Sequence, residues 1–86
     1  MFEVVWYSAA MDVVDDLFLT LDEQAQRGLV RVIGDLNDRL ARSPLNAGES
    51  RGGSFRLTFV ELLAVYFWVD EANAVVRVTA TRRYGR

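Results

Sequence analysis

The residues best suited to chemistry are arginines and one tyrosine in the second half of the chain. Every second residue from Arg77 to Arg83 is Arg or Thr, so a strand here would point these side chains to one side of a sheet. Arg56 is one of the polar residues that alternate with apolar ones along another predicted strand. Guanidinium groups on one open sheet face could clamp a phosphodiester and stabilise charge developing on phosphorus. The candidate set is Arg51, Arg56, Arg77, Arg82, Arg83, Tyr84 and Arg86.

Tyr84 is the candidate proton carrier beside these arginines. The alternative interpretation is that these arginines keep the domain soluble and protect a sheet edge, as exposed charges often do.

The residue types that are absent exclude several reaction classes. The 86 residues contain no His and no Cys, and all ten basic residues are Arg. Zinc sites built on Cys or His, Ser–His and Cys–His nucleophile pairs, and thiol redox couples are therefore ruled out. Asp12, Asp15 and Asp16 do not have a spacing that fixes an octahedral oxygen cage. We expect no metal and no cofactor.

The charge is distributed unevenly along the chain. The net charge is −2, but residues 1–41 hold three Arg against eight acids and residues 42–86 hold seven Arg against four. A basic second half suggests a local anion-binding surface, although these charges could simply solvate the protein. The first residues lack a basic segment, and the longest apolar run, residues 62–69, is too short to span a bilayer. We therefore expect a cytoplasmic protein.

The first half of the chain predicts a strand followed by two helices. Residues 2–7 are rich in β-branched and aromatic side chains and form the predicted strand. Ser8 is the expected N-cap of a first helix that runs to about Leu19. Thr20 and Glu23 have capping-box spacing, which predicts a second, longer helix that ends near Ser43, because Pro44 disfavours helix in the residue before it.

The second half predicts a loop and three strands. The loop, residues 44–53, leads from helix into strand and has no Lys, so a mobile connector with Arg51 at its tip fits better than a phosphate-binding loop. Strands are predicted at 54–60, 62–69 and 74–81, the second of them covered on both faces. Most of the aromatic side chains on these strands are expected in the core, with one or two exposed. The fold class is α+β in β-α-α-β-β-β order: an antiparallel sheet with a helical hairpin on one face, in a single domain over 1–86.

Several stretches of the chain resemble one known protein family. They are the strand, helical hairpin and meander order, Arg42-x-Pro44-Leu, Gly48-Glu-Ser-Arg51, Leu62-Leu-Ala-Val-Tyr66 and Val75-Val-Arg-Val-Thr79. Together they are similar to the RelE/ParE superfamily of toxins from bacterial type II toxin–antitoxin systems. The resemblance covers almost the whole chain and rests on pattern and element order.

The resemblance implies a small cytoplasmic toxin that a cognate antitoxin holds inactive. RelE-like members are metal-independent endoribonucleases that cut mRNA on the ribosome by attack of a 2′-hydroxyl on the adjacent phosphate. ParE-like members lack that catalytic set and poison DNA gyrase. Arg56, Arg82 or Arg83, and Tyr84 stand where the nuclease branch has functional residues, whereas Leu63 stands where that branch has an arginine. The resemblance implies Arg56, Arg83 and Tyr84 as candidate catalytic residues. It leaves RNA or phosphate binding to Arg51, Arg77, Arg82 and Arg86. The alternative function is a non-catalytic binding domain that retains only the partner-binding fold.

Overall fold

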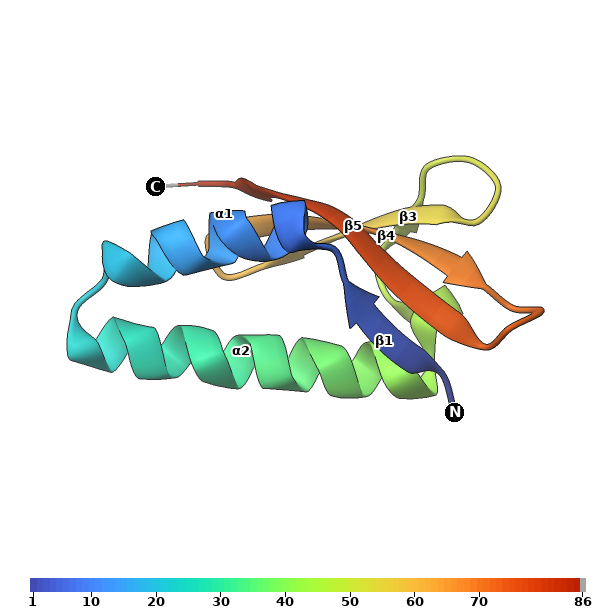
Figure 1. Ribbon diagram of the computed structural model, residues 1–86, viewed down its shortest axis with the longest axis horizontal. Helices are drawn as coiled ribbons and strands as arrows, with labels where there is room; N and C mark the ends of the chain where they lie inside the picture. The colour runs from blue at the N-terminus through green and yellow to red at the C-terminus, as the bar shows by residue number, and fades with distance from the viewer. Residues whose placement is uncertain (86) are drawn as a thin grey trace.

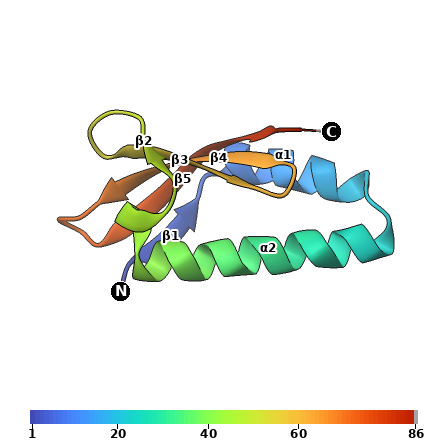
Figure 2. The same ribbon diagram turned by 180° about the vertical axis from the view of Figure 1, so that it is seen from behind.

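The computed structural model describes residues 1–85 as a five-stranded sheet with two helices on one side (Figures 1 and 2). The elements follow the order β1, α1, α2, η1, β2, β3, β4 and β5. Their bounds are β1 Glu3–Trp6, α1 Ser8–Leu19, α2 Glu23–Arg42, the 3₁₀ turn η1 Pro44–Asn46, β2 Glu49–Ser50, β3 Phe55–Val60, β4 Leu63–Asp70 and β5 Val75–Arg83. Within residues 1–85, none of the helices has the length and apolar character needed to cross a bilayer.

The sheet confirms the α+β fold with a helical hairpin on one face and adds two details. The strand order is β1-β5-β4-β3-β2, and β3, β4 and β5 form the expected antiparallel meander. β1 pairs with β5 in parallel, so the sheet is mixed. The predicted loop at 44–53 contains the turn η1 and the two-residue strand β2, which pairs with β3.

The core lies between the helices and one face of the sheet. Ala10, Val14 and Leu17 of α1, and Leu29, Leu36 and Leu40 of α2, are buried in it. From the sheet, Leu63, Val65, Phe67, Val69, Val76 and Val78 are at most 1% exposed. The helices cover only this face, so the prediction that β4 is covered on both faces is wrong. Tyr66 and Trp68 remain half-buried on the other side.

The helix caps differ from those predicted. The Asp22 carboxylate accepts a hydrogen bond from the Ala25 N–H at 2.8 Å, so Asp22 is the N-cap of α2. Thr20 instead ends α1, where its hydroxyl donates to the Leu17 carbonyl at 2.7 Å. Ser8 is the first residue of α1, and its N-cap is Tyr7, which makes no side-chain capping bond. Thr20 and Asp22 are both suitable N-cap residues. The capping-box spacing predicted Thr20, whereas Asp22 caps α2 in the structure.

A β-bulge in β5 decides which side chains reach which face. Phe67 pairs with Val78 and Tyr66 pairs with Ala80, so Thr79 has no partner in β4. One extra residue reverses the alternation of side chains beyond it. Thr81 consequently lies opposite Val65 on the helix side, buried, and its hydroxyl donates to the Ala10 carbonyl at 2.6 Å. The prediction that Arg77, Thr79, Thr81 and Arg83 point to one side is therefore wrong.

In strand β3, the side chains that face the helices are not the ones expected. The two-residue turn after Val60 places Val60 opposite Leu63 and Arg56 opposite Phe67, which is a core residue. Residues directly opposite in an antiparallel pair share a face, so Arg56 and Thr58 lie on the helix side. Phe55, Leu57 and Phe59 lie on the open face of the sheet, the face that the helices leave uncovered.

Gly48 allows the segment after η1 to pass close to β3. Its φ is +72°, and a Cβ at this position would overlap the backbone carbonyl of Leu57. An L side chain would thus meet both backbone strain and a clash with a paired strand.

We expect Gly48→Ala to lower the free energy of unfolding by roughly 2 kcal/mol or more, since strain and overpacking add. Urea unfolding followed by circular dichroism measures this. The matched control is Gly28→Ala in α2, where nothing lies within 4 Å of the added Cβ. The control should be neutral or stabilising by up to about 1 kcal/mol. Equal destabilisation by both substitutions would contradict the proposed close approach at Gly48.

Candidate functional site

The open face of the sheet carries a row of aromatic side chains. Phe55 pairs with Trp68 across β3 and β4, with ring centroids 6.4 Å apart. Phe59 contacts Tyr84 with ring centroids 4.6 Å apart. Phe55, Phe59 and Tyr84 are 50%, 47% and 52% exposed. Exposed aromatic side chains gathered on one face are typical of a binding surface.

Arg77 lies on this face and is already paired. Its guanidinium donates to the Asp70 carboxylate at 3.0 Å and lies 5.2 Å from the centre of the Trp68 ring. Hydrogen bonds from Asn73 and then from Arg77 lower the pKa of Asp70 below its ordinary value. Because an ionised carboxylate neutralises it at short range, Arg77 is a weak candidate for binding a phosphate.

Arg82 and Arg83 point to different sides of the sheet. Arg82 lies opposite Ala64 on the open face and is exposed. Arg83 lies opposite the core residue Leu63, on the helix side. There it borders a cavity of about 140 Å³ near the end of α1, together with Thr20 and Tyr84. The bulge at Thr79 causes this separation.

The Arg56 side chain binds backbone carbonyl groups of this chain, whereas it was expected to bind a substrate phosphate. Its Nε donates to the Ala47 carbonyl at 3.2 Å, and a terminal guanidinium nitrogen donates to the Gly48 carbonyl at 3.0 Å. Its partner Phe67 lies four residues along β4 from Leu63, the partner of Arg83. Four residues of strand span about 13 Å. The structure does not bring Arg56 and Arg83 to one phosphate.

The remaining predicted site residues are dispersed. Arg51 follows β2 and makes an exposed ion pair with Glu49 at 3.3 Å. The Tyr84 N–H donates to the Leu62 carbonyl at 2.9 Å, which fixes the segment after β5 beside the β3–β4 turn. Arg86 lies outside the described residues. Among the predicted reactive groups within residues 1–85, Arg83 and Tyr84 border a common cavity.

The sequence analysis allowed one or two exposed aromatic side chains on the strands, and Phe55 and Phe59 are the exposed pair. It did not identify these two, because their spacing is that of core residues. The signal that could have placed them is the two-residue turn at Glu61 and Leu62, because it fixes Phe59 opposite Ala64. Once Leu63, Val65 and Phe67 are assigned to the core, this register turns both phenylalanines outward.

The architecture, a helical hairpin over one face of a meander with β1 added in parallel, occurs in a class of bacterial toxins. The chain resembles a structure of the RelBE2 toxin–antitoxin complex of Mycobacterium tuberculosis, with TM-score 0.71, 16% identity and coverage of 99% of this chain and 93% of that chain. A structure of the chromosomal ParDE system of P. aeruginosa gives TM-score 0.73, 19% identity and coverage of 99% and 98%. The isolated RelE toxin of E. coli gives 0.64, 15% identity and coverage of 100% and 87%.

The chain therefore has the RelE/ParE toxin fold, and the resemblance seen in the sequence is confirmed. No protein-family model and no curated protein sequence matches it. At these levels of identity the likeness extends to the fold, while the side chains on the open face are this chain's own.

We expect Asp70→Asn to destabilise the protein more near neutral pH than in acid. The folded-state pKa of Asp70 is lowered, so its ionised form stabilises the fold above the ordinary Asp pKa, and this contribution is lost as the pH falls through the folded value. Unfolding of wild type and variant by urea at about pH 7 and about pH 3 measures the difference. A difference that is the same at both pH values would contradict the role of the charge. Glu71→Gln, an exposed neighbour, is the control.

Proposed function

We propose that this protein is the toxin component of a type II toxin–antitoxin module, held inactive in the cytoplasm by a cognate antitoxin. The observation that carries the proposal is the fold, which matches chains from toxin–antitoxin complexes over 99–100% of this chain. Exposed apolar side chains occur both on the open face and on the helices, as Phe55 and Val30 illustrate. Such patches are common where a partner protein binds.

We further propose that the toxin acts by binding a protein target rather than by cutting RNA. The open face presents aromatic rings, Arg77 is neutralised by Asp70, and Arg56 is committed to backbone carbonyls. A net charge of −2 also does little to attract a polyanion. Among RelE/ParE toxins, the protein-binding mode is the ParE-like one, so DNA gyrase is the target to test first.

Ribosome-dependent cleavage of mRNA is the second candidate function. The observation that favours it is that Arg83 and Tyr84 both border the small cavity near the end of α1. In this mechanism Arg83 would stabilise charge on the phosphate while Tyr84 transfers a proton. The cavity is small and the second cation, Arg56, is absent from it, which is why we place this function second.

Expression in a bacterial host separates the candidate functions. We expect induction of the chain to arrest growth, and co-expression of the adjacent antitoxin gene to restore it. Purified chain should inhibit DNA supercoiling by gyrase and leave ribosome-bound mRNA intact in a translation extract. Specific mRNA cuts lost in Arg83→Ala would instead establish the nuclease. Normal growth on induction of soluble chain would favour a non-catalytic binding domain.

We expect Phe55→Ser and Phe59→Ser to reduce growth inhibition at least tenfold, measured as surviving colonies after induction, because each removes an exposed ring from the proposed target surface. Both residues are about half exposed, so the fold should survive. Leu45→Ser is the matched control, since Leu45 is 45% exposed but lies in η1, outside the sheet. If toxicity persisted in the double variant Phe55→Ser/Phe59→Ser, the open face would not be the target surface.

A further inference from the structure

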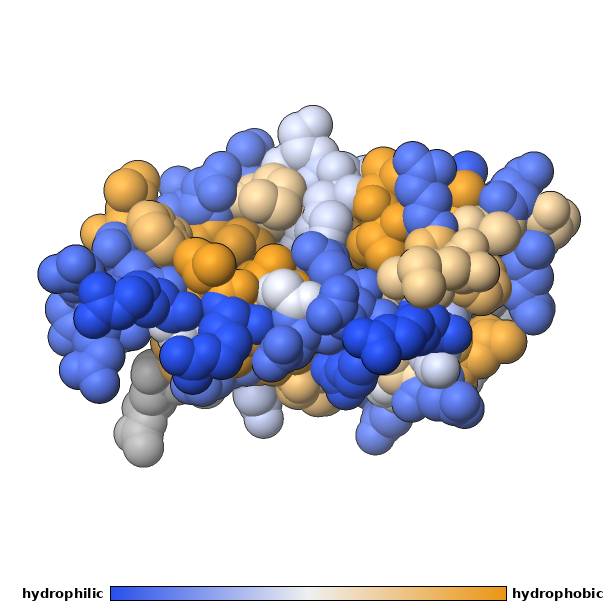
Figure 3. Space-filling model, turned by 90° about the horizontal axis from the view of Figure 1, so that it is seen from below, coloured by the Kyte–Doolittle hydropathy of each residue, from blue (hydrophilic) through white to orange (hydrophobic). Residues whose placement is uncertain are grey.

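The helical hairpin has a second apolar surface, on the opposite side of the molecule from the open face. A groove of about 280 Å³ between α1 and α2 is lined by Asp15 and by the apolar side chains Met11, Val14, Phe18, Leu29, Val30 and Ile33. Val30 is 61% exposed, and Leu19 at the end of α1 is 78% exposed. Figure 3 shows hydrophobic side chains gathered here, with a strongly hydrophilic row beside them. We call the groove and these exposed side chains the apolar strip. No other segment within residues 1–85 covers it.

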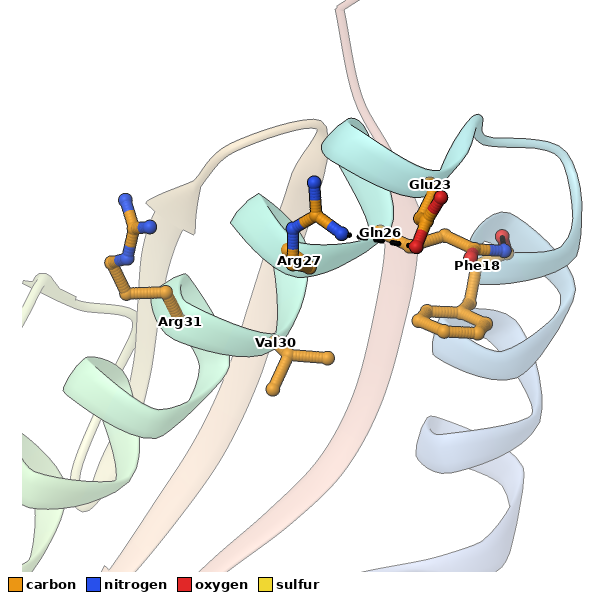
Figure 4. A pocket seen from close by; sticks show the side chains of 6 residues that line it. All are labelled: Phe18, Glu23, Gln26, Arg27, Val30 and Arg31. Carbon is orange, nitrogen blue, oxygen red and sulfur yellow. Dashed lines mark hydrogen bonds and ion pairs between the residues drawn. The ribbon is translucent and has the colours of Figure 1, made fainter.

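Beside this groove, α1 presents acidic side chains and α2 presents two arginines together with Glu23. On α1, Asp12 and Asp15 are exposed. On α2, Arg27 and Arg31 border a wider hollow that also includes Phe18 and Val30 (Figure 4). Arg27 makes only an exposed ion pair with Glu23, at 3.1 Å, which is a weak interaction. The apolar strip therefore has an acidic side and a basic side.

The opposite charges also lie at matching heights along the hairpin. Asp15 is four residues before the end of α1 at Leu19, and Arg27 is four residues after the start of α2 at Glu23. Each is thus about 6 Å of helix rise from the connection that joins the helices. Asp12 and Arg31, seven and eight residues from the same helix ends, lie at about 11 and 12 Å.

Gly34 adds an independent observation. It lies in the interior of α2, seven residues after Arg27, on the same exposed side of the helix, and nothing lies within 4 Å of a Cβ built on it. A glycine inside a helix costs about 1 kcal/mol relative to alanine, and the packing of this chain does not require one here. The absent side chain leaves room for another helix to approach closely.

We propose that this face binds a second copy of the same chain, as a two-fold symmetric dimer built on a four-helix contact. A two-fold axis that runs parallel to the helices, above the groove, places α1 of one copy over α2 of the other. It preserves height along the helices, so Asp15 of each copy meets Arg27 of its partner and Asp12 meets Arg31. The same self-complementary patch serves both copies, as a two-fold interface requires. This inference does not depend on the toxin activity.

Analytical ultracentrifugation of the purified chain over a wide concentration range tests the proposal. We expect a monomer–dimer equilibrium in the wild type. Arg27→Glu/Arg31→Glu makes both sides of the strip acidic, and Asp12→Arg/Asp15→Arg makes both basic, so each variant alone should dissociate at least tenfold more readily. The two variants mixed in equal amounts should form a heterodimer, because every contact again joins unlike charges. Recovery on mixing also shows that both variants are folded.

The matched control is Arg51→Glu/Arg82→Glu, which changes the net charge as much as Arg27→Glu/Arg31→Glu but lies on β2–β3 and β5, away from the hairpin. It should dimerise like the wild type. A wild-type chain that stays monomeric at every concentration would overturn the proposal, and so would a dimer that the hairpin variants leave unchanged. Failure of the mixed variants to associate would overturn the two-fold pairing. A monomer whose groove instead binds a helix of the antitoxin would assign this face to that partner.

Discussion

The packing of the helices against one face of β4 and β5 is the interaction on which the rest of the structure depends. Phe67, Val65 and Val78 are completely buried there, and Ala10 of α1 lies against the same core. Within residues 1–85 the buried apolar residues form this one core, as expected for a chain of 86 residues. Because the helices occupy one side of the sheet, the other side must face solvent or a partner. Both candidate binding surfaces, the open face and the outer face of the hairpin, follow from this one-sided arrangement.

Much of the fold could be predicted from the sequence because the strongest patterns are long. The 20 residues of α2 repeat apolar positions at helical spacing, and Pro44 stops them, so the element and its end were predicted correctly. The meander of β3, β4 and β5 was predicted for a similar reason, since the apolar and alternating patterns of its three strands are local signals. The parallel pairing of β1 with β5 joins segments about 70 residues apart and has no local signature.

The candidate site was harder to predict because its geometry depends on two events that composition does not encode. The bulge at Thr79 sends Arg83 to the opposite side from Arg77. The register of the β3–β4 turn sends Arg56 toward the helices, where backbone carbonyls bind its guanidinium. The alternation of side chains along a strand shows which of them share a face only while the strand is regular. The arginines that the sequence pattern grouped on one face therefore lie in three separate environments in the structure.

The bulge has a consequence for how this surface can change during evolution. Substitutions on β5 usually alter one side chain at a time, but one that closed the bulge, so that Thr79 paired with Tyr66, would restore regular alternation and exchange the faces of every residue beyond it. Arg83 would then join Arg77 above the sheet, while Arg82 would move beneath it. Thr81, whose hydroxyl now bonds to α1, would leave the core. A register shift of one residue could thus exchange the arginine that stands on the aromatic surface and remove a buried contact between α1 and the sheet, with no change in chain length.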